Sequence, residues 1–358
     1  MPSLKEIKGR INSISSTLAI TSAMKMVASA KLQKAQMAIQ NMLPYERRLY
    51  SMLVDLMGAM NISAAASEDG SVRGSGSAER GFDQSGDRLS LSNRHDLAGM
   101  DGAYSLMAQR EVRKVAIVAF ASNSSLCGAF NSNVIREATA VINEYRASGL
   151  GDADIVVYSV GRKMAEAMRK LGFPSPADFT RMSDSPSYEA ASALAQELLD
   201  GFVSGRFDKV ELVYNHYKST SSQPTTRQTY LPLSLADATA DLQAGKITDP
   251  ASETDTNRGA EPVGAPVVRQ GSPTTEDLIV EPSKEALIAT LLPKVIRLRI
   301  FTTLLDSAAA EHAARTVAMQ LATDNGNDLL QELTLEYNKG RQQKITSEIL
   351  DLVGGSMQ

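Results

Sequence analysis

Apolar side chains recur every three or four residues near the start of the chain, with no proline between Pro2 and Pro44. Alternating spacings of three and four place them in one stripe on a helix and are typical of a coiled-coil seam. Pro2 is tolerated at a helix start, and Ser3 can cap it. Roughly forty helical residues would extend about 60 Å, so the sequence predicts a partner helix along this length. The stripe comprises Leu4, Ile7, Ile11, Ile14, Leu18, Thr21, Met24, Val27, Ala28, Lys31 and Leu32.

The end of the chain has the same periodicity and is the candidate partner. Helical spacing begins at Ser283, but Pro293 predicts a break or kink. A second, longer helix is then predicted over 307–353, and Gly354-Gly355 is a suitable stop. The positions that fit a seam are Val317, Leu321, Leu329, Leu330, Leu333, Ile345, Ile349, Leu352 and Val353.

Strands and helices alternate between these two arms. This alternation predicts an α/β fold with a mostly parallel, layered, Rossmann-like sheet. The last two strands are close enough in sequence to form an antiparallel edge hairpin. Strands are predicted at 112–121, 155–160, 210–218 and 227–233, and helices at 131–146, 162–171 and 188–202.

Composition divides the chain further. Two segments are poor in large apolar residues and rich in small and polar ones, which favours flexible insertions. The predicted order is an N-terminal coiled-coil helix, an insertion or linker, the α/β domain, an acidic insertion, a final strand (Ile279 to Glu281) with a short helix, and a C-terminal coiled-coil helix. Their ranges are 1–58, 59–111, 112–235, 236–277, 278–306 and 307–358.

The charge is unevenly spread. The 358 residues carry a net charge of -4, yet residues 1–60 hold eight Lys or Arg against three acids, and residues 236–282 hold three against nine. The first 36 residues, with Glu6 as the single acid, also fit an organelle transit peptide, although such a peptide needs no heptad register. No apolar stretch is long enough to span a bilayer.

The sequence offers little for bond chemistry. One cysteine and three histidines exclude a disulfide framework and a Cys/His zinc site, and we predict no catalytic residue, metal or cofactor. The loop at 121–131 lacks the spaced glycines of a dinucleotide site, and no phosphate loop occurs. A stand-alone nucleotide-binding enzyme with helical extensions stays as an alternative. Cys127 reads either as a nucleophile or as a packing residue, and the absence of an identified base favours packing.

Polar side chains crowd both terminal helices, where a plain coiled coil would carry more leucine. Such side chains suit contacts that form and break, whereas buried apolar anchors would lock an interface. A scaffold coiled coil is the second alternative. The polar positions are Lys25, Lys31, Arg315, Asn325, Asn338, Arg341, Gln342, Gln343 and Thr346.

Several motifs resemble the ATP synthase gamma subunit family. They are Ile20–Ala28, the turn Ser125–Asn131, and three C-terminal stretches, namely 311–319, 322–325 and 337–349. The two low-complexity segments fall outside this resemblance. Ser124-Ser125 stands where the family commonly has Arg-Gly, and Ala129 where it has a second glycine; these departures bear on the fine geometry of the turn and not on the family.

The resemblance implies an antiparallel coiled coil inserted in a ring of three alpha and three beta subunits. It places the α/β domain beside the epsilon subunit and the membrane c-ring. Rotation would couple proton (or sodium) flow to ATP synthesis or hydrolysis and would regulate ATPase activity, with no catalytic site in the chain itself. The implied location is peripheral, on the cytoplasmic side of a bacterial inner membrane. The implied rotor–stator and coupling contacts are Met24, Lys25, Arg315, Arg341, Gln342, Thr346 and Glu348.

Overall fold

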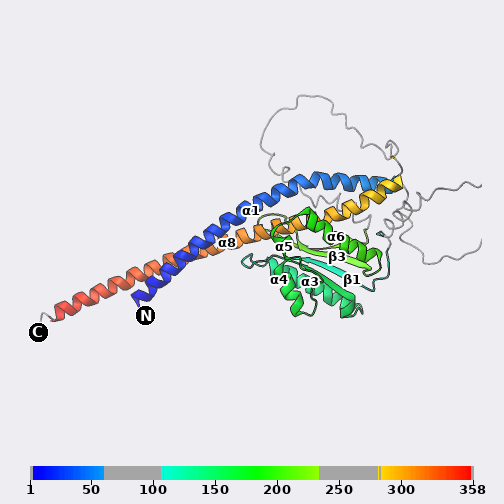
Figure 1. Ribbon diagram of the computed structural model, residues 1–358. Helices are drawn as coiled ribbons and strands as arrows, with labels where there is room; N and C mark the ends of the chain where they lie inside the picture. Colours follow the sequence, from blue (N-terminus) through cyan, green and yellow to red (C-terminus); the bar gives the residue numbers. More distant parts are fainter. Residues whose placement is uncertain (1–2, 60–105, 108, 234–280, 282–283, 356–358) are drawn as a thin grey trace, which may run out of the picture.

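Two long helices dominate the computed structural model, which describes residues 3–59, 106–107, 109–233, 281 and 284–355. Helix α1 (Leu4–Ala59) has 56 residues and helix α8 (Lys284–Gly355) has 72 (Figure 1). They run antiparallel, because Leu4 lies against Gly340 while Leu18 lies against Gly326. The predicted antiparallel pairing of the terminal helices is therefore confirmed, and we call this pair the shaft.

Of the two outcomes predicted at Pro293, a break or a kink, the break is wrong. Helix α8 is continuous from Lys284, so the separate short helix and C-terminal helix, divided at 306/307, form one element. A proline inside a helix costs about 3 kcal/mol, but Leu292, Val295 and Ile296 around it are fully buried. Each large apolar side chain buried in this way contributes about 1.5–3 kcal/mol, so packing outweighs the lost hydrogen bond.

Four strands form the sheet of the α/β domain, in the order β2-β1-β3-β4. They are β1 (Val115–Phe120), β2 (Ile155–Val160), β3 (Lys209–Asn215) and β4 (Thr225–Leu231). Strand β1 pairs in parallel with β2 and β3, while β4 is antiparallel to β3. Both the mostly parallel sheet and the edge hairpin are confirmed.

Helices cover both faces of this sheet. Helices α3 (Phe130–Ala147) and α4 (Arg162–Lys170) pack on one face, and α6 (Tyr188–Val203) packs with the shaft on the other. All six residues of β1 are buried, which explains its continuous apolar sequence. Two short helices were not predicted, η2 (Asp152–Asp154) and α5 (Thr180–Asp184).

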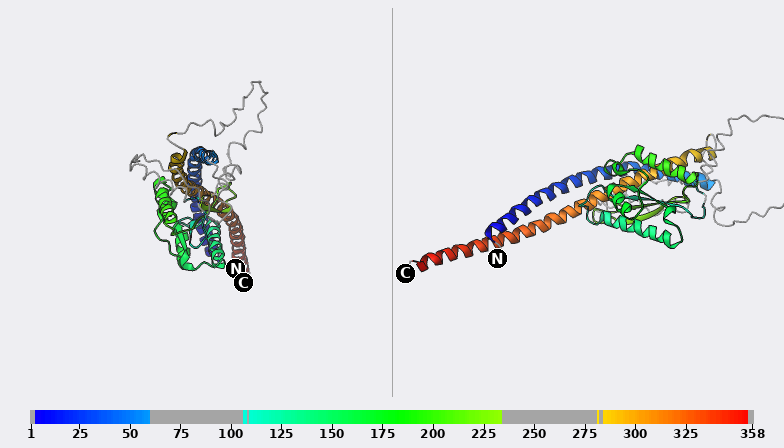
Figure 2. Two further views of the ribbon diagram at one scale, coloured as in Figure 1. Left: turned by 90° about the vertical axis from the view of Figure 1, so that its right-hand side faces the viewer. Right: turned by 60° about the horizontal axis from the view of Figure 1, so that its bottom comes forward.

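The shaft is anchored at one end and free at the other. Leu53 and Leu56 of α1 and Leu292 of α8 lie in the same buried cluster as α6 and the sheet. From this base the two helices extend away from the α/β domain, and α8 continues past the beginning of α1 (Figures 1 and 2). None of the helices in the described ranges is both long enough and apolar enough to cross a bilayer.

The two predicted insertions lie largely or wholly outside the described residues, as do two of the three residues of the strand predicted at 279–281. One part of the first insertion is described and differs from the prediction. Leu106 is 4% exposed, and its carbonyl accepts a hydrogen bond from the Leu233 N–H at 3.0 Å. The chain is therefore already packed on the core before 112, where the domain was predicted to begin.

Candidate functional site on the shaft

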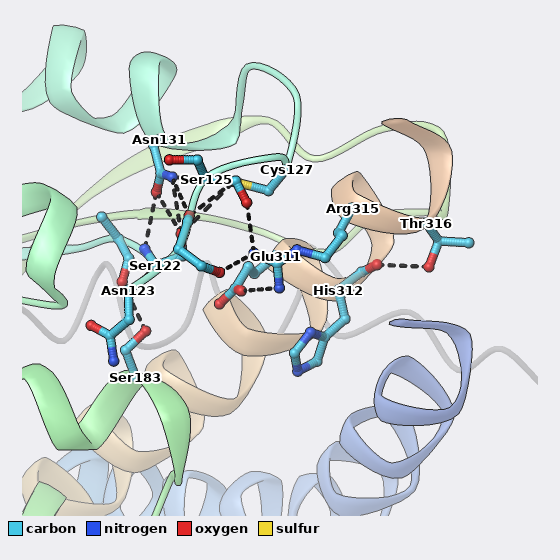
Figure 3. A network of polar contacts seen from close by, with 12 residues as sticks. Ser122, Asn123, Ser125, Cys127, Asn131, Ser183, Glu311, His312, Arg315 and Thr316 are labelled. Carbon is cyan, nitrogen blue, oxygen red and sulfur yellow. Dashed lines mark hydrogen bonds and ion pairs between the residues drawn. The ribbon is translucent and has the colours of Figure 1, made fainter. Parts of the chain in front are cut away.

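The turn after β1, residues 122–131, is closed by its own polar groups (Figure 3). The Ser122 N–H donates to Asn131 Oδ1 at 3.0 Å, and Asn131 Nδ2 donates to the Ser124 carbonyl at 3.1 Å. Leu126 (φ 68°) and Gly128 (φ 59°) supply the left-handed conformations. Ala129 has φ -83°, so alanine fits where the family commonly has glycine.

Arg315 of α8 fastens this turn to the shaft. Its Nη2 donates to Ser124 Oγ at 2.7 Å, and its Nη1 lies 2.7 Å from Glu311 Oε1, one helical turn away. The two side chains are only 13% and 9% exposed. Burial raises the pKa of the Glu311 carboxyl, and the Arg315 charge opposes this rise. A nearly buried ion pair therefore holds the guanidinium against the turn, a geometry that favours one fixed arrangement.

Cys127 packs in the turn and contacts the shaft. Its side chain is 1% exposed and clusters with Phe130 and Ala310 of α8. Asn131 Nδ2 lies 3.1 Å from the cysteine Sγ. His312 points away from the turn, toward α1 (Figure 3), and burial lowers its pKa to about 4. These positions support the interpretation of Cys127 as a packing residue.

The place where Rossmann-like folds bind ligands is filled by side chains. In such sheets the ligand crevice lies at the carboxyl ends of the strands where the strand order reverses, here between β1 and β3. Asn215 Nδ2 donates to the Phe130 carbonyl at 3.0 Å across this position, and Tyr217 packs beside Phe130. A cavity beside Ser183 and Glu311 measures only about 10 Å³, room for one water. This geometry disfavours a nucleotide in the domain.

Small residues let the two helices approach closely along the shaft. A Cβ on Gly326 would lie 2.6 Å from Leu18 Cδ2, and one on Gly340 would lie 3.2 Å from Leu4 Cδ2. Thr323 donates to Thr21 between their hydroxyls at 3.1 Å. The two glycines, which interrupt the helical sequence pattern, are therefore contact positions of the seam.

The predicted contact residues fall into three settings. Met24 and Lys25 are half-buried on α1, and Arg315 is held at the turn. The other four are exposed and lie beyond Gly340, where α8 continues without its partner (Figure 1); they are Arg341, Gln342, Thr346 and Glu348. Met24, Lys25 and Arg315 therefore do not lie together with the four residues beyond Gly340.

Sequence reasoning missed the residues that join the α/β domain to the shaft. Glu311 appeared only as part of a motif, and Asp306, which bonds to the loop after β3, was not considered. Asp306 bonds to a loop 89 positions away. Glu311 holds Arg315, which in turn bonds to Ser124, 191 positions away. No spacing in the sequence signals contacts of that range.

Fold and site together define a class of protein: a long two-helix shaft anchored at one end in a Rossmann-like domain. A family model described as ATP synthase matches residues 3–357. The chain is 47% identical over 357 residues to the ATP synthase gamma chain of Phocaeicola vulgatus, with 100% of both chains covered. It is 45% identical over 358 residues to that of Bacteroides thetaiotaomicron, again covering 100% of each. The chain therefore belongs to the ATP synthase gamma chain family.

A solved structure shares the fold. The rotor of the Euglena gracilis mitochondrial ATP synthase matches 96% of this chain and 98% of its own, with a TM-score of 0.51 at 18% identity. The two bacterial relatives are covered over their full lengths. The low-complexity segments, which the motif resemblance left out, are thus included in these matches.

Proposed function

We propose that the chain is the central-stalk rotor of an ATP synthase. Its rotation couples proton (or sodium) movement through a membrane ring to ATP synthesis or hydrolysis in a catalytic head, and it thereby regulates ATPase activity. The chain contributes no catalytic site of its own. Membership of the gamma chain family supports this proposal.

One structural observation carries the proposal: the shaft is buried at one end and exposed at the other, where polar side chains stand beside exposed apolar ones such as Ile349 and Leu352. A rotor needs a stiff element fixed to the driven part, and two paired helices with an anchored base supply one. It also needs an end that contacts its surroundings without locking, and exposed polar side chains form such contacts at small cost. The free end of α8 carries Arg341, Gln342 and Thr346, all exposed.

The proposed partners follow from the family. The free end of the shaft lies in a ring of three alpha and three beta subunits, and the α/β domain contacts the epsilon subunit and the membrane c-ring. The complex is peripheral on the cytoplasmic side of a bacterial inner membrane. The basic first 60 residues, eight cations against three acids, suit acidic loops on beta, an attraction that weakens with salt.

We propose Met24, Lys25, Arg341, Gln342, Thr346 and Glu348 as contacts with the head. Arg315 differs from them, because its guanidinium is already bonded to Glu311 and Ser124. A contact between Arg315 and beta would use N–H groups of the guanidinium that these two partners leave over. A substitution of Arg315 would therefore disturb the turn as well as any contact with the head.

Copurification tests the proposal against both alternatives. The tagged chain is expressed with the alpha and beta subunits of its own genome, and the subunit ratio is measured by native mass spectrometry. We expect three alpha and three beta subunits for each chain. A chain that elutes alone and binds ATP would support the stand-alone enzyme. A chain that elutes alone without binding ATP would support a scaffold.

A further inference from the structure

Tyr217 and His216 lie where the shaft leaves the α/β domain, immediately after β3. The Tyr217 N–H donates to Asp306 Oδ1 at 2.9 Å, and His216 Nδ1 lies 2.6 Å from Asp306 Oδ2. Both carboxylate oxygens of Asp306 on α8 are thus engaged by two consecutive residues of one loop. Two-point contacts of this kind fix orientation as well as distance.

The same loop also reaches the other shaft helix. Gln36 Nε2 of α1 donates to the Tyr217 hydroxyl at 2.6 Å. One dipeptide therefore bonds to α8 through its backbone and imidazole and to α1 through its phenol. Helix α1 here lies on the far side of α8 from most of the α/β domain (Figure 1).

The Tyr217 ring joins two apolar clusters. One is the seam between the helices, formed by Leu32 of α1 with Ala309 and Ala313 of α8. The other is the turn cluster of Cys127, Phe130 and Ala310. The alanines of α8 leave room for the ring to reach both. The ring therefore links the helix seam to the same turn that Arg315 holds.

This segment of α8 is enclosed on several sides. The loop after β3 contacts it at Asp306, the turn contacts it at Ala310 and Arg315, and α1 contacts it at Ala309 and Ala313. Toward the free end the side chains become exposed, beginning with Leu321 at 57%. The enclosed segment is therefore where the contacts between the α/β domain and the shaft end, in the direction of the free end.

We propose that Asp306, His216, Tyr217 and Gln36 form a strap that fixes both shaft helices to the α/β domain at this exit. Asp306 and Tyr217 are positioning residues. Without the strap, α8 would still be held by Arg315 and both helices by their buried base, but neither helix would be bonded to the loop after β3. Rotation of the domain would then be transmitted to the free end less rigidly. The inference rests on the proposed rotor function only for this last consequence.

Hydrogen exchange on the full chain tests the strap itself. Asp306→Ala removes the acceptor of the Tyr217 N–H, and we expect exchange of that amide to rise about fivefold, the ratio expected for one hydrogen bond. Gln36→Ala should raise exchange in α1 around residues 32–40, whereas Gln33→Ala, an exposed glutamine on the same helix, should not. Unchanged exchange in both strap variants would overturn the strap. If Asp306→Ala does not fold, Tyr217→Phe tests the α1 end of the strap, because it removes the acceptor of Gln36 while the ring stays in place. Unchanged exchange in α1 in both Tyr217→Phe and Gln36→Ala would then overturn the strap.

Ion pumping tests whether the strap is needed to transmit rotation from the α/β domain to the free end of the shaft. In membrane vesicles holding the complex, we expect Asp306→Ala to lose ATP-driven ion pumping while ATP hydrolysis and complex content are kept, and Asp306→Asn, which still accepts from Tyr217, to recover part of it. Asp152→Asn, which breaks an exposed pair with Arg146 inside the domain, is the matched control. Equal loss of pumping and hydrolysis would overturn the positioning role. Failure of the rotor function would instead appear in the wild type, which would neither assemble nor pump.

Discussion

The two ends of the shaft are built by opposite means. At the base, Leu53 and Leu292 are fully buried against α6 and the sheet, and the helix tolerates Pro293 without a break. At the free end, Ile349 and Leu352 are 54% and 75% exposed, and α8 has no partner helix (Figure 2). Stability is therefore concentrated at the base, whereas the free end is available for contacts with other chains.

The largest effect on stability is expected at the base. Leu53→Ala leaves a cavity under the sheet and should lower the free energy of unfolding by about 2–5 kcal/mol. Leu335→Ala, a leucine that is 66% exposed on α8, should change it by less than about 0.5 kcal/mol. Urea unfolding of the full chain, followed by circular dichroism, measures both. Equal effects would contradict the proposed division between the buried base and the exposed part of the shaft.

A smaller effect is expected in the middle of the shaft. Gly326→Leu places atoms where Leu18 already lies, and such overpacking should cost about 1–3 kcal/mol. Gly9→Leu is the control, because a Cβ there meets nothing within 4 Å and leucine is the better helix former. The same unfolding experiment applies. Adding Leu18→Ala to Gly326→Leu should restore stability, and no recovery would show that the register of the seam is different.

At the turn, we expect a loss of stability equal to the contribution of about one hydrogen bond. Ser124→Ala removes the acceptor of Arg315 Nη2 and should cost about 1 kcal/mol. Ser125→Ala should cost less, because Ser125 meets Arg315 through its backbone carbonyl, at 3.5 Å. Thermal unfolding of the two variants side by side gives the comparison. If Ser125→Ala proves the more costly, the assigned role of Ser124 is wrong.

The smallest effect on stability, with the clearest effect on function, is expected at the free end. Arg341→Ala combined with Gln342→Leu removes exposed side chains and should change stability by less than about 0.5 kcal/mol. ATP synthesis in membrane vesicles should nevertheless fall while the complex still assembles. The pair Arg341→Ala with Thr346→Val provides an independent variant. Normal ATP synthesis in both variants would contradict the assignment of these residues as contacts with the head.

Much of the fold was predictable because it depends on local pattern. The apolar run of β2 gave its observed bounds, Ile155–Val160, and the periodicity of both arms gave the paired helices. The predicted break at Pro293 does not occur, because burial of the neighbouring apolar side chains outweighs the helix-breaking effect of proline. Helix α5 was missed because its five residues are too few to show a helical period.

The candidate site was predictable only in part. Motifs indicated Arg315 and the turn, but not that Ser124 and Glu311 hold the guanidinium. The loop that bonds to Asp306 and Gln36 depends on how β3 is placed against both helices. Such contacts arise from the assembled sheet and shaft, and neither residue stands out in its own stretch of sequence.

Rotation of the shaft within the head tests the central claim most directly. The alpha and beta subunits are fixed to a surface, a bead is attached to an exposed cysteine introduced at Arg136 on α3, and ATP is added. The account predicts continued rotation of the bead in one direction, which ends when ATP is removed. Full ATP hydrolysis by intact complexes whose beads stay still would contradict it.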